Sequence, residues 1–313
     1  MIRIPRTDLD IFPLNLGGNT FGWTSDRDTS FAVLDAFVEA GGNFVDTADQ
    51  YSVWVEGLKG GESERIIGEW LKERGNRDEM VIATKVGGHP SRAGLSAANV
   101  ESALDESLKR LNTDYVDIYY AHYDDQKVDV INQVLHAESL VKSGKVKHIG
   151  LSNYSPARMR QWFEVAYAGN HTLPVAIQPQ YNLLNRRDFE QSYLPIVQDY
   201  NAAVFPYFAL ASGVLTGKYR SKEDLQGAPR RDFVEGLIMD ESLRVVDAVV
   251  EIAEARDVAP ATISLAWLLA KGVTAPVASA SKPEQLPDLV AAADFQLSED
   301  EVQRLDTASQ PFA

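Results

Sequence analysis

The stretch from Gly42 to Tyr51 places a carboxylate and a phenol directly after a short strand pattern. The segment 43–45 is apolar and β-prone, and it leads into Asp46 without an intervening turn. A buried sheet cannot hold an unpaired charge, so Asp46 needs a partner. A carboxylate at the carboxyl end of a strand, with Tyr51 on the following loop, is typical of an active site in a β/α barrel. The alternative is that Asp46 caps a turn and Tyr51 packs in the core.

Two later apolar runs also end in chemically active side chains, namely Lys85 and His122. Strand ends that are distant in sequence converge at one mouth of a barrel, so both can reach Tyr51. A lysine ammonium beside a phenol would lower the phenol pKa from its usual value of about 10. Asp46 would balance the lysine, and His122 would orient a carbonyl. We therefore expect proton donation to a carbonyl oxygen, with hydride from a bound nicotinamide or flavin, since no side chain delivers hydride.

Strand and helix patterns alternate about eight times along the chain, after a weakly alternating segment 2–13 that predicts a hairpin. We expect one domain, 1–313, of the α/β class: a (β/α)8 TIM barrel with an N-terminal β-hairpin and a long loop, 209–240, after strand 7. The eight strands are expected within 14–20, 43–46, 80–85, 115–122, 146–151, 175–178, 203–207 and 273–278. A doubly wound open sheet is disfavoured, because 17–22 lacks the G-x-G-x-x-G spacing.

Composition narrows the classes of partner. The formal charge of −15 argues against nucleic acid and anionic membrane surfaces as partners. The chain has no cysteine, which excludes disulfides and thiolate metal sites, and no HxH or HExxH spacing indicates a metal. The first residues lack the apolar core of a signal peptide, and no apolar run is long enough to span a bilayer. We expect a cytoplasmic protein that acts on a small molecule; its oligomeric state is left open.

Several stretches resemble the aldo-keto reductase family, in the family's order and over essentially the whole chain. They are Asn43-Phe44-Val45-Asp46-Thr47-Ala48 with Tyr51, Ala83-Thr84-Lys85, the segment 114–119 through His122, and the segments 150–154, 178–184 and 213–219. The resemblance implies a (β/α)8 barrel that performs NAD(P)(H)-dependent oxidoreduction. It implies that Tyr51 is the general acid–base and that Asp46 and Lys85 tune it. It also implies that His122 binds and orients the carbonyl.

The same resemblance implies a set of cofactor contacts. At the nicotinamide it places Ser152, Asn153, Gln178 and Tyr207, at the pyrophosphate Leu210, Ser212, Leu215 and Lys218, and at the adenosine end Ser279, Ser281, Lys282 and Gln285. Ser281 and Lys282 precede an expected helix N-terminus, a favourable place for a phosphate, so we expect NADP(H) rather than NAD(H). NAD(H) stays an alternative, because Ser279 and Ser281 replace a Gly-x-Arg-like pattern of many relatives.

Three aromatic residues follow strand exits and are candidates for the substrate pocket: Trp23, Trp54 and Tyr123. Ordinary packing is the alternative for the two tryptophans. The leading hypothesis is an oxidoreductase that reduces aldehydes or ketones to alcohols, reversibly. One alternative is a nicotinamide-binding regulatory or sensor subunit with little turnover, and a weaker one is a barrel aldolase with Lys85 as a Schiff-base nucleophile.

Overall fold

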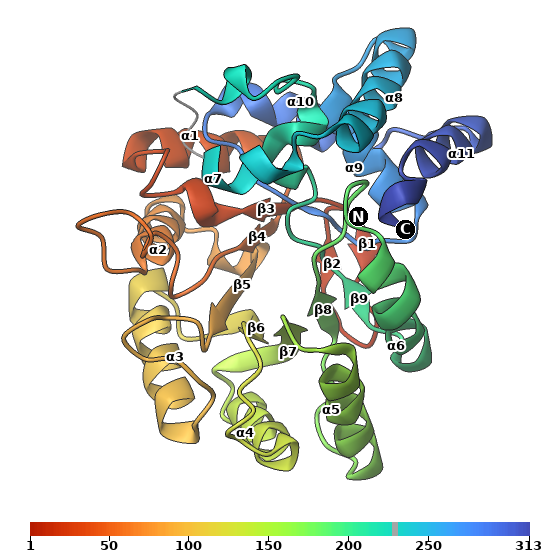
Figure 1. Cartoon of the computed structure of the whole chain (residues 1–313). Coiled ribbons are helices and arrows are strands. Elements are labelled where there is room, and N and C mark those ends of the chain that lie inside the picture. The colour runs from red at the N-terminus through yellow and green to blue at the C-terminus, as the bar shows by residue number, and fades with distance from the viewer. Residues whose placement is uncertain (227–230) are drawn as a thin grey trace.

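The apolar runs of the sequence become eight parallel strands in the order β10-β3-β4-β5-β6-β7-β8-β9. The computed structural model describes residues 1–226 and 231–313, and Figure 1 shows the strands inside a ring of helices. The amides of Ala275 and Val277 donate to the carbonyls of Val204 and Pro206 over 3.3 and 3.0 Å, which joins β10 to β9 and closes the ring. The predicted (β/α)8 barrel is therefore confirmed. The strands are β3 (Asn15–Gly17), β4 (Phe44–Asp46), β5 (Val81–Val86), β6 (Val116–Ala121), β7 (Val146–Ser152), β8 (Ala176–Gln178), β9 (Ala203–Val204) and β10 (Val277–Ala278).

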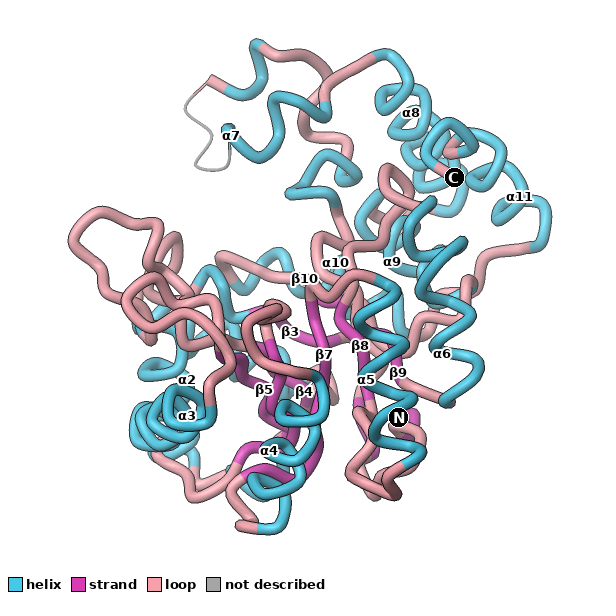
Figure 2. Tube along the Cα trace, turned by 60° about the horizontal axis from the view of Figure 1, so that its bottom comes forward, coloured by secondary structure: helices cyan, strands magenta, loops and turns pink. Residues whose placement is uncertain are grey.

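The helices pack outside the strands, as Figure 2 shows from a second direction. Their bounds are α1 (Arg27–Glu39), α2 (Glu62–Arg74), α3 (Ala97–Leu111), α4 (Val130–Lys142), α5 (Pro156–Ala168), α6 (Leu194–Tyr200), α7 (Arg231–Val234), α8 (Asp240–Arg256), α9 (Pro260–Ala270), α10 (Leu286–Val290) and α11 (Glu299–Ala308). Capping side chains fix where some of these helices begin. Asp26 accepts the amide of Thr29 at the start of α1, and Ser298 and Glu301 form a capping box on α11. Within the described chain no helix is long and apolar enough to cross a bilayer.

The core has two layers, because every strand of a closed parallel barrel is covered on both faces. All six residues of β5 are buried, for example. The larger layer lies between strands and helices, and the smaller one fills the barrel. The predicted hairpin forms as β1 (Ile2–Arg3) paired with β2 (Asp10–Ile11), and it packs Ile4, Leu9 and Ile11 into the barrel cluster. The hairpin thus plugs the end opposite the carboxyl mouth.

The predicted long connection after β9 contains short helical turns. These are 3₁₀ turns at Ala211–Thr216, Glu223–Leu225 and Glu235–Leu237, together with α7. In Figure 2, α7 lies away from the strands. Part of the expected loop, 227–230, lies outside the described residues. The helix expected from Pro283 begins as a 3₁₀ turn, Pro283–Gln285, and becomes α-helical as α10.

Candidate functional site

The site residues are positioned by the regular alternation of side chains along each strand, which point in turn into the barrel and out toward the helices. Phe44 and Ala83 belong to the cluster inside the barrel, and two residues further along the same strands stand Asp46 and Lys85. Successive side chains of a strand point to opposite faces, so residues i and i+2 share the inside. On β6 the inward-facing residues are Ile118 and Tyr120, and two residues further, just past the strand, stands His122. The His122 amide donates to the carbonyl of Val86 over 2.8 Å. The side chains that point into the barrel are therefore apolar along the strands and become polar at the carboxyl mouth.

Asp46, Tyr51 and Lys85 form one hydrogen-bonded set. Lys85 Nζ donates to the Tyr51 hydroxyl over 2.9 Å, to the carbonyl of Thr47 over 2.8 Å, and to Oδ2 of Asp46. The Tyr51 hydroxyl is 3.2 Å from the same Oδ2. Gln178 donates from Nε2 to Oδ1 of Asp46 over 2.9 Å, so both carboxylate oxygens are engaged. The structure thus brings together the phenol, ammonium and carboxylate that the sequence predicts.

The electrostatics of this set differ from the expectation in one respect. Burial, followed by the charge of Asp46, raises the pKa of Tyr51 well above its usual value of 10. The predicted lowering of the Tyr51 pKa is therefore wrong for the protein alone, because burial disfavours the phenolate and the carboxylate that holds Lys85 also faces the phenol. Burial lowers the pKa of Lys85, and Asp46 opposes that shift. Tyr51 is consequently a protonated hydroxyl at neutral pH.

His122 is buried beside Tyr51, with ring centroids 6.3 Å apart. Burial, and then the charge of Lys85, lower the pKa of His122 well below 6.5, so the imidazole is neutral at physiological pH. Its Nδ1 has no hydrogen-bond partner in the structure. Asn153 donates from Nδ2 to the His122 carbonyl over 2.8 Å and fixes the backbone there. Nδ1 is itself buried, so a substrate oxygen could reach only the other ring nitrogen, Nε2, of this neutral imidazole.

The four residues expected at the nicotinamide lie at neighbouring strand ends. Ser152 is fully buried and donates its hydroxyl to the carbonyl of Gln178 over 2.8 Å. Gln178 is also buried and is held by Asp46, as described above. The Tyr207 hydroxyl donates to Oδ1 of Asn153 over 2.9 Å, and both residues are partly exposed. Asn153 and Tyr207 therefore form the accessible part of this group, while Ser152 and Gln178 hold it from behind.

The segment expected at the pyrophosphate makes a left-handed turn. Ala211, Ser212 and Gly213 have φ of 48°, 55° and 97°, a run that L-residues adopt only where the surroundings enforce it. A Cβ on Gly213 would come within 2.8 Å of Nζ of Lys218, so the ammonium folds closely over this turn. Leu215 is buried in the core and Leu210 is partly buried. A left-handed turn under a lysine ammonium suits an anionic group.

The residues expected at the adenosine end lie on two sides of a tight turn. Oε1 of Gln285 accepts the amide of Ser281 over 2.8 Å and lies 3.2 Å from its hydroxyl. The side chain of Gln285 thus stabilises the turn. Ser279 donates its hydroxyl to Asn19, which ties this segment to the end of β3. Lys282 is exposed next to the turn and is the one cation of this group.

The three aromatic residues predicted for the substrate pocket adjoin the group formed by Asp46, Tyr51, Lys85 and His122. The Trp54 ring lies 6.0 Å from the Tyr51 ring and 5.5 Å from the Trp23 ring, edge to face in both cases. Tyr123 stacks on His122, with centroids 4.7 Å apart at 26°. Trp54 and Tyr123 are 44% and 42% exposed, so each offers a free ring surface next to Tyr51 or His122.

The sequence did not single out Phe208, which follows Tyr207 at the mouth and whose ring centroid lies 5.2 Å from that of Tyr207. Phe208 has φ 54°, and the buried Asn182 holds its carbonyl through a 2.9 Å bond from Nδ2. Such strain in a bulky residue is characteristic of functional sites. No sequence pattern marks a phenylalanine with positive φ, so this signal exists only in three dimensions.

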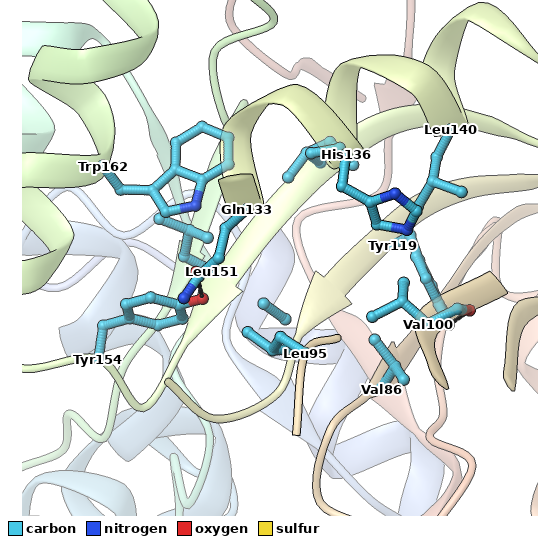
Figure 3. A pocket seen from close by; sticks show the side chains of 13 residues that line it. Val86, Leu95, Val100, Tyr119, Gln133, His136, Leu140, Leu151, Tyr154 and Trp162 are labelled. Carbon is cyan, nitrogen blue, oxygen red and sulfur yellow. Dashed lines mark hydrogen bonds between the residues drawn. The ribbon is translucent and has the colours of Figure 1, made fainter. Parts of the chain in front are cut away.

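A separate cavity of about 40 Å³ lies between the barrel wall and helices α3 to α5 (Figure 3). Figure 3 shows His136, Gln133 and Trp162 around it, and the lining residues include none of Asp46, Tyr51, Lys85 and His122. Its volume admits one or two waters and is far too small for a dinucleotide. Across residues 1–226 and 231–313, no group of three or more His, Asp or Glu side chains could hold a metal.

Comparison with known proteins agrees with this geometry. The model of the Aldo/keto reductase family matches residues 13–310. The norsolorinic acid reductase of Emericella nidulans is 33% identical over 96% of this chain and 79% of its own. An aryl-alcohol dehydrogenase of Pestalotiopsis microspora is 31% identical over 96% and 80%, and a probable voltage-gated potassium channel subunit beta of Oryza sativa subsp. japonica is 30% identical over 93% and 90%. The chain therefore belongs to the aldo/keto reductase family of oxidoreductases.

Proposed function

We propose that this protein interconverts aldehydes or ketones and their alcohols with NADP(H), and that Tyr51 donates or accepts the proton. The observation that carries the proposal is the set in which Lys85 binds both the Tyr51 hydroxyl and Asp46. The cofactor, when bound, supplies or takes up the hydride. The left-handed turn under Lys218, the accessible Asn153 and Tyr207, and the exposed Lys282 support a dinucleotide at this mouth.

Each residue of the set has a distinct part in this chemistry. The raised pKa keeps Tyr51 protonated, so its hydroxyl is ready to donate to a carbonyl oxygen that becomes an alkoxide. Proton transfer is favourable because an alkoxide is a much stronger base than a phenolate. The Lys85 ammonium stabilises the negative charge left on the phenol. The neutral His122 imidazole orients the carbonyl through Nε2.

Tyr51→Phe tests this role directly. Removing the hydroxyl should lower kcat by about 10²-fold or more, the range of general-acid catalysis. NADPH should still bind to this variant, as measured by fluorescence titration. The matched control is Tyr167→Phe, which removes the hydroxyl of a tyrosine that is 70% exposed on α5. Turnover by Tyr51→Phe equal to that of the control would remove Tyr51 from the mechanism.

We further propose that the substrate carbonyl is attached to an aromatic ring. Trp54 exposes a large apolar ring surface next to Tyr51, and Tyr123 exposes one next to His122; such surfaces at a mouth indicate a ligand. Aromatic rings prefer edge-to-face or offset contacts, which Trp23 and Trp54 already display. Two of the relatives are named an aryl-alcohol dehydrogenase and a norsolorinic acid reductase.

Benzaldehyde and cyclohexanecarbaldehyde form a matched pair for this test. We expect a higher kcat/KM for benzaldehyde, and Trp54→Leu should reduce the ratio by about 2- to 10-fold, the value of one aromatic contact. Tyr167→Leu, far from the mouth, is the control. An unchanged ratio in Trp54→Leu would contradict the aromatic preference and leave the role of Tyr51 intact.

A second candidate function is a nicotinamide-binding regulatory subunit with little turnover. It is favoured by the relative named as a potassium channel subunit. The complete hydrogen-bonded set at Tyr51 argues for turnover instead. NADPH oxidation measured with a panel of aldehydes discriminates the two functions. A sensor would bind NADPH but would not oxidise it with any aldehyde of the panel. The Schiff-base alternative is disfavoured, since Lys85 donates to three acceptors and has no lone pair for attack.

A further inference from the structure

Two polar side chains lie together beside Tyr51 and His122, and the proposed mechanism does not use them. Gln50 directly precedes Tyr51 in the chain, and Tyr123 directly follows His122. Nε2 of Gln50 donates to the Tyr123 hydroxyl over 3.5 Å, a long and weak hydrogen bond. The Tyr123 ring stacks on the His122 ring, with centroids 4.7 Å apart. An amide and a phenol hydroxyl therefore adjoin the groups proposed to bind the carbonyl.

A glycine at the neighbouring strand end gives these two side chains their space. Gly88 lies two residues beyond β5, and a Cβ there would meet Oε1 of Gln50 at 2.2 Å and Cε2 of Tyr123 at 2.6 Å. Its φ lies outside the left-handed region, so the backbone conformation does not require glycine. Gly88 is therefore explained by the close approach of Gln50 and Tyr123 rather than by a turn.

Gln50 and Tyr123 have hydrogen-bonding capacity that the protein leaves unused. Across residues 1–226 and 231–313, Oε1 of Gln50 accepts no hydrogen bond and the Tyr123 hydroxyl donates none. Both side chains are accessible, Tyr123 at 42% exposure and Gln50 in part. A hydroxyl group of a ligand would match both, because it can donate to the amide oxygen and accept from the phenol. A carboxylate would match poorly, since neither side chain supplies a cation and Oε1 of Gln50 would repel it.

We propose that Gln50, Gly88 and Tyr123 form a specificity site for a hydroxyl group on the aromatic ring of the substrate. With the carbonyl at Tyr51 and His122, a ring that extends along the stacked Tyr123 brings its substituent to the Gln50 amide. Oε1 of Gln50 accepts the proton of that hydroxyl, and Tyr123 donates to its oxygen. The preferred substrates are therefore hydroxylated aromatic aldehydes or ketones. The inference rests on the proposed function and names the substrate class of the same site.

Gln50→Leu removes the amide and keeps a side chain of similar size. The measured quantity is the ratio of kcat/KM for hydroxybenzaldehyde to kcat/KM for methylbenzaldehyde, both substituted at the ring position that the wild type prefers. The ratio should fall by about 2- to 10-fold in the variant, the value of one neutral hydrogen bond. Ring electronics cancel, because both proteins receive the same substrates. Gln303→Leu, which removes a surface amide on α11, is the matched control, and an unchanged ratio in Gln50→Leu would overturn the proposal.

Gly88→Ala tests the same site without removing a polar group. The new methyl group displaces Gln50 or Tyr123, so the hydroxyl-to-methyl ratio should again fall. Stability should change little, because both side chains can move toward solvent. Gly236→Ala, where a Cβ meets nothing within 4 Å, is the control. A loss of stability in Gly88→Ala with an unchanged ratio would show a purely structural role and overturn the proposal.

A binding measurement separates this inference from the proposed function. Hydroxybenzamides and methylbenzamides, substituted at ring position 3 or 4, resemble the aldehydes and test recognition without turnover. Calorimetry with NADPH present should show that the wild type binds the better hydroxybenzamide about 2- to 10-fold more tightly than its methyl counterpart. Equal affinities would overturn the proposal even if the variants fail to fold. Absence of aldehyde turnover with this preference present would contradict the proposed function alone.

Discussion

The side-chain amide of Gln178 donates to Oδ1 of Asp46 over 2.9 Å, from a position 132 residues further along the chain. The bond joins β8 to β4 across the mouth of the barrel. It leaves Oδ2 of Asp46 for Lys85 and Tyr51. Gln178 therefore helps to orient the carboxylate that also bonds Lys85 and Tyr51.

Replacing Gln178 with Leu should destabilise the protein by about 1–3 kcal/mol. The change leaves Oδ1 of the fully buried Asp46 carboxylate without a hydrogen-bond donor, so no bond offsets the free energy of removing this oxygen from water. The measurement is the free energy of unfolding in urea. Gln303→Leu on α11, where the amide bonds only the nearby Thr307 at the surface, is the control and should stay within about 0.5 kcal/mol. Equal stability of the two variants would contradict the structural role of the Gln178 bond.

The buried His122 should make stability depend on pH. Its folded pKa lies well below 6.5, so below about pH 6.5 the unfolded chain binds a proton that the folded chain does not. The free energy of unfolding should therefore fall as pH drops through 6.5, by at most about 1.4 kcal/mol per unit. His122→Gln removes this contribution. Urea midpoints at pH 7.5, 6.5 and 5.5 measure the slope, which should be steeper for wild type than for the variant; identical slopes would contradict a neutral buried imidazole.

Gly150→Ala should be destabilising because of a close approach inside the barrel. A Cβ at position 150 would meet Cε1 of Tyr120 at 2.2 Å, and the ring is fully buried. Overpacking of this kind costs about 1–3 kcal/mol. Thermal unfolding compares it with Gly236→Ala, where a Cβ meets nothing within 4 Å. If Gly150→Ala matched this control, the Tyr120 ring could not lie over the glycine.

Lys282→Ala should reduce the preference for NADPH over NADH. In the proposed function the exposed ammonium beside the Ser281 turn binds the 2′-phosphate. Loss of one charged hydrogen bond of about 1.5–3 kcal/mol then corresponds to roughly a tenfold or larger rise in KM for NADPH. The KM for NADH should not change. Lys109→Ala on α3 serves as the surface control. A wild-type protein that used NADH more efficiently than NADPH would make this assignment wrong.

Much of the barrel could be predicted because its signals are local. A buried parallel strand appears in the sequence as a short apolar run, and every second side chain of that run points into the barrel. Those two facts suffice to place Asp46, Lys85 and His122 at one mouth. The loop after the Asp46 strand adds Tyr51 at the same mouth, and the family pattern gives the same residue. Strand ends were less predictable, since β9 covers only Ala203–Val204 of the expected 203–207, where backbone pairing rather than side-chain type sets the limit.

The sequence by itself determined the order of strands and helices and the residue types at the strand exits, because periodicity and composition are properties of neighbours along the chain. Tertiary structure alone decided which oxygen of Asp46 meets Gln178 and which meets Lys85. It also reversed the expected pKa shift of Tyr51. These features depend on burial and on charges brought together from distant segments, and desolvation and Coulomb energies are set by positions in space.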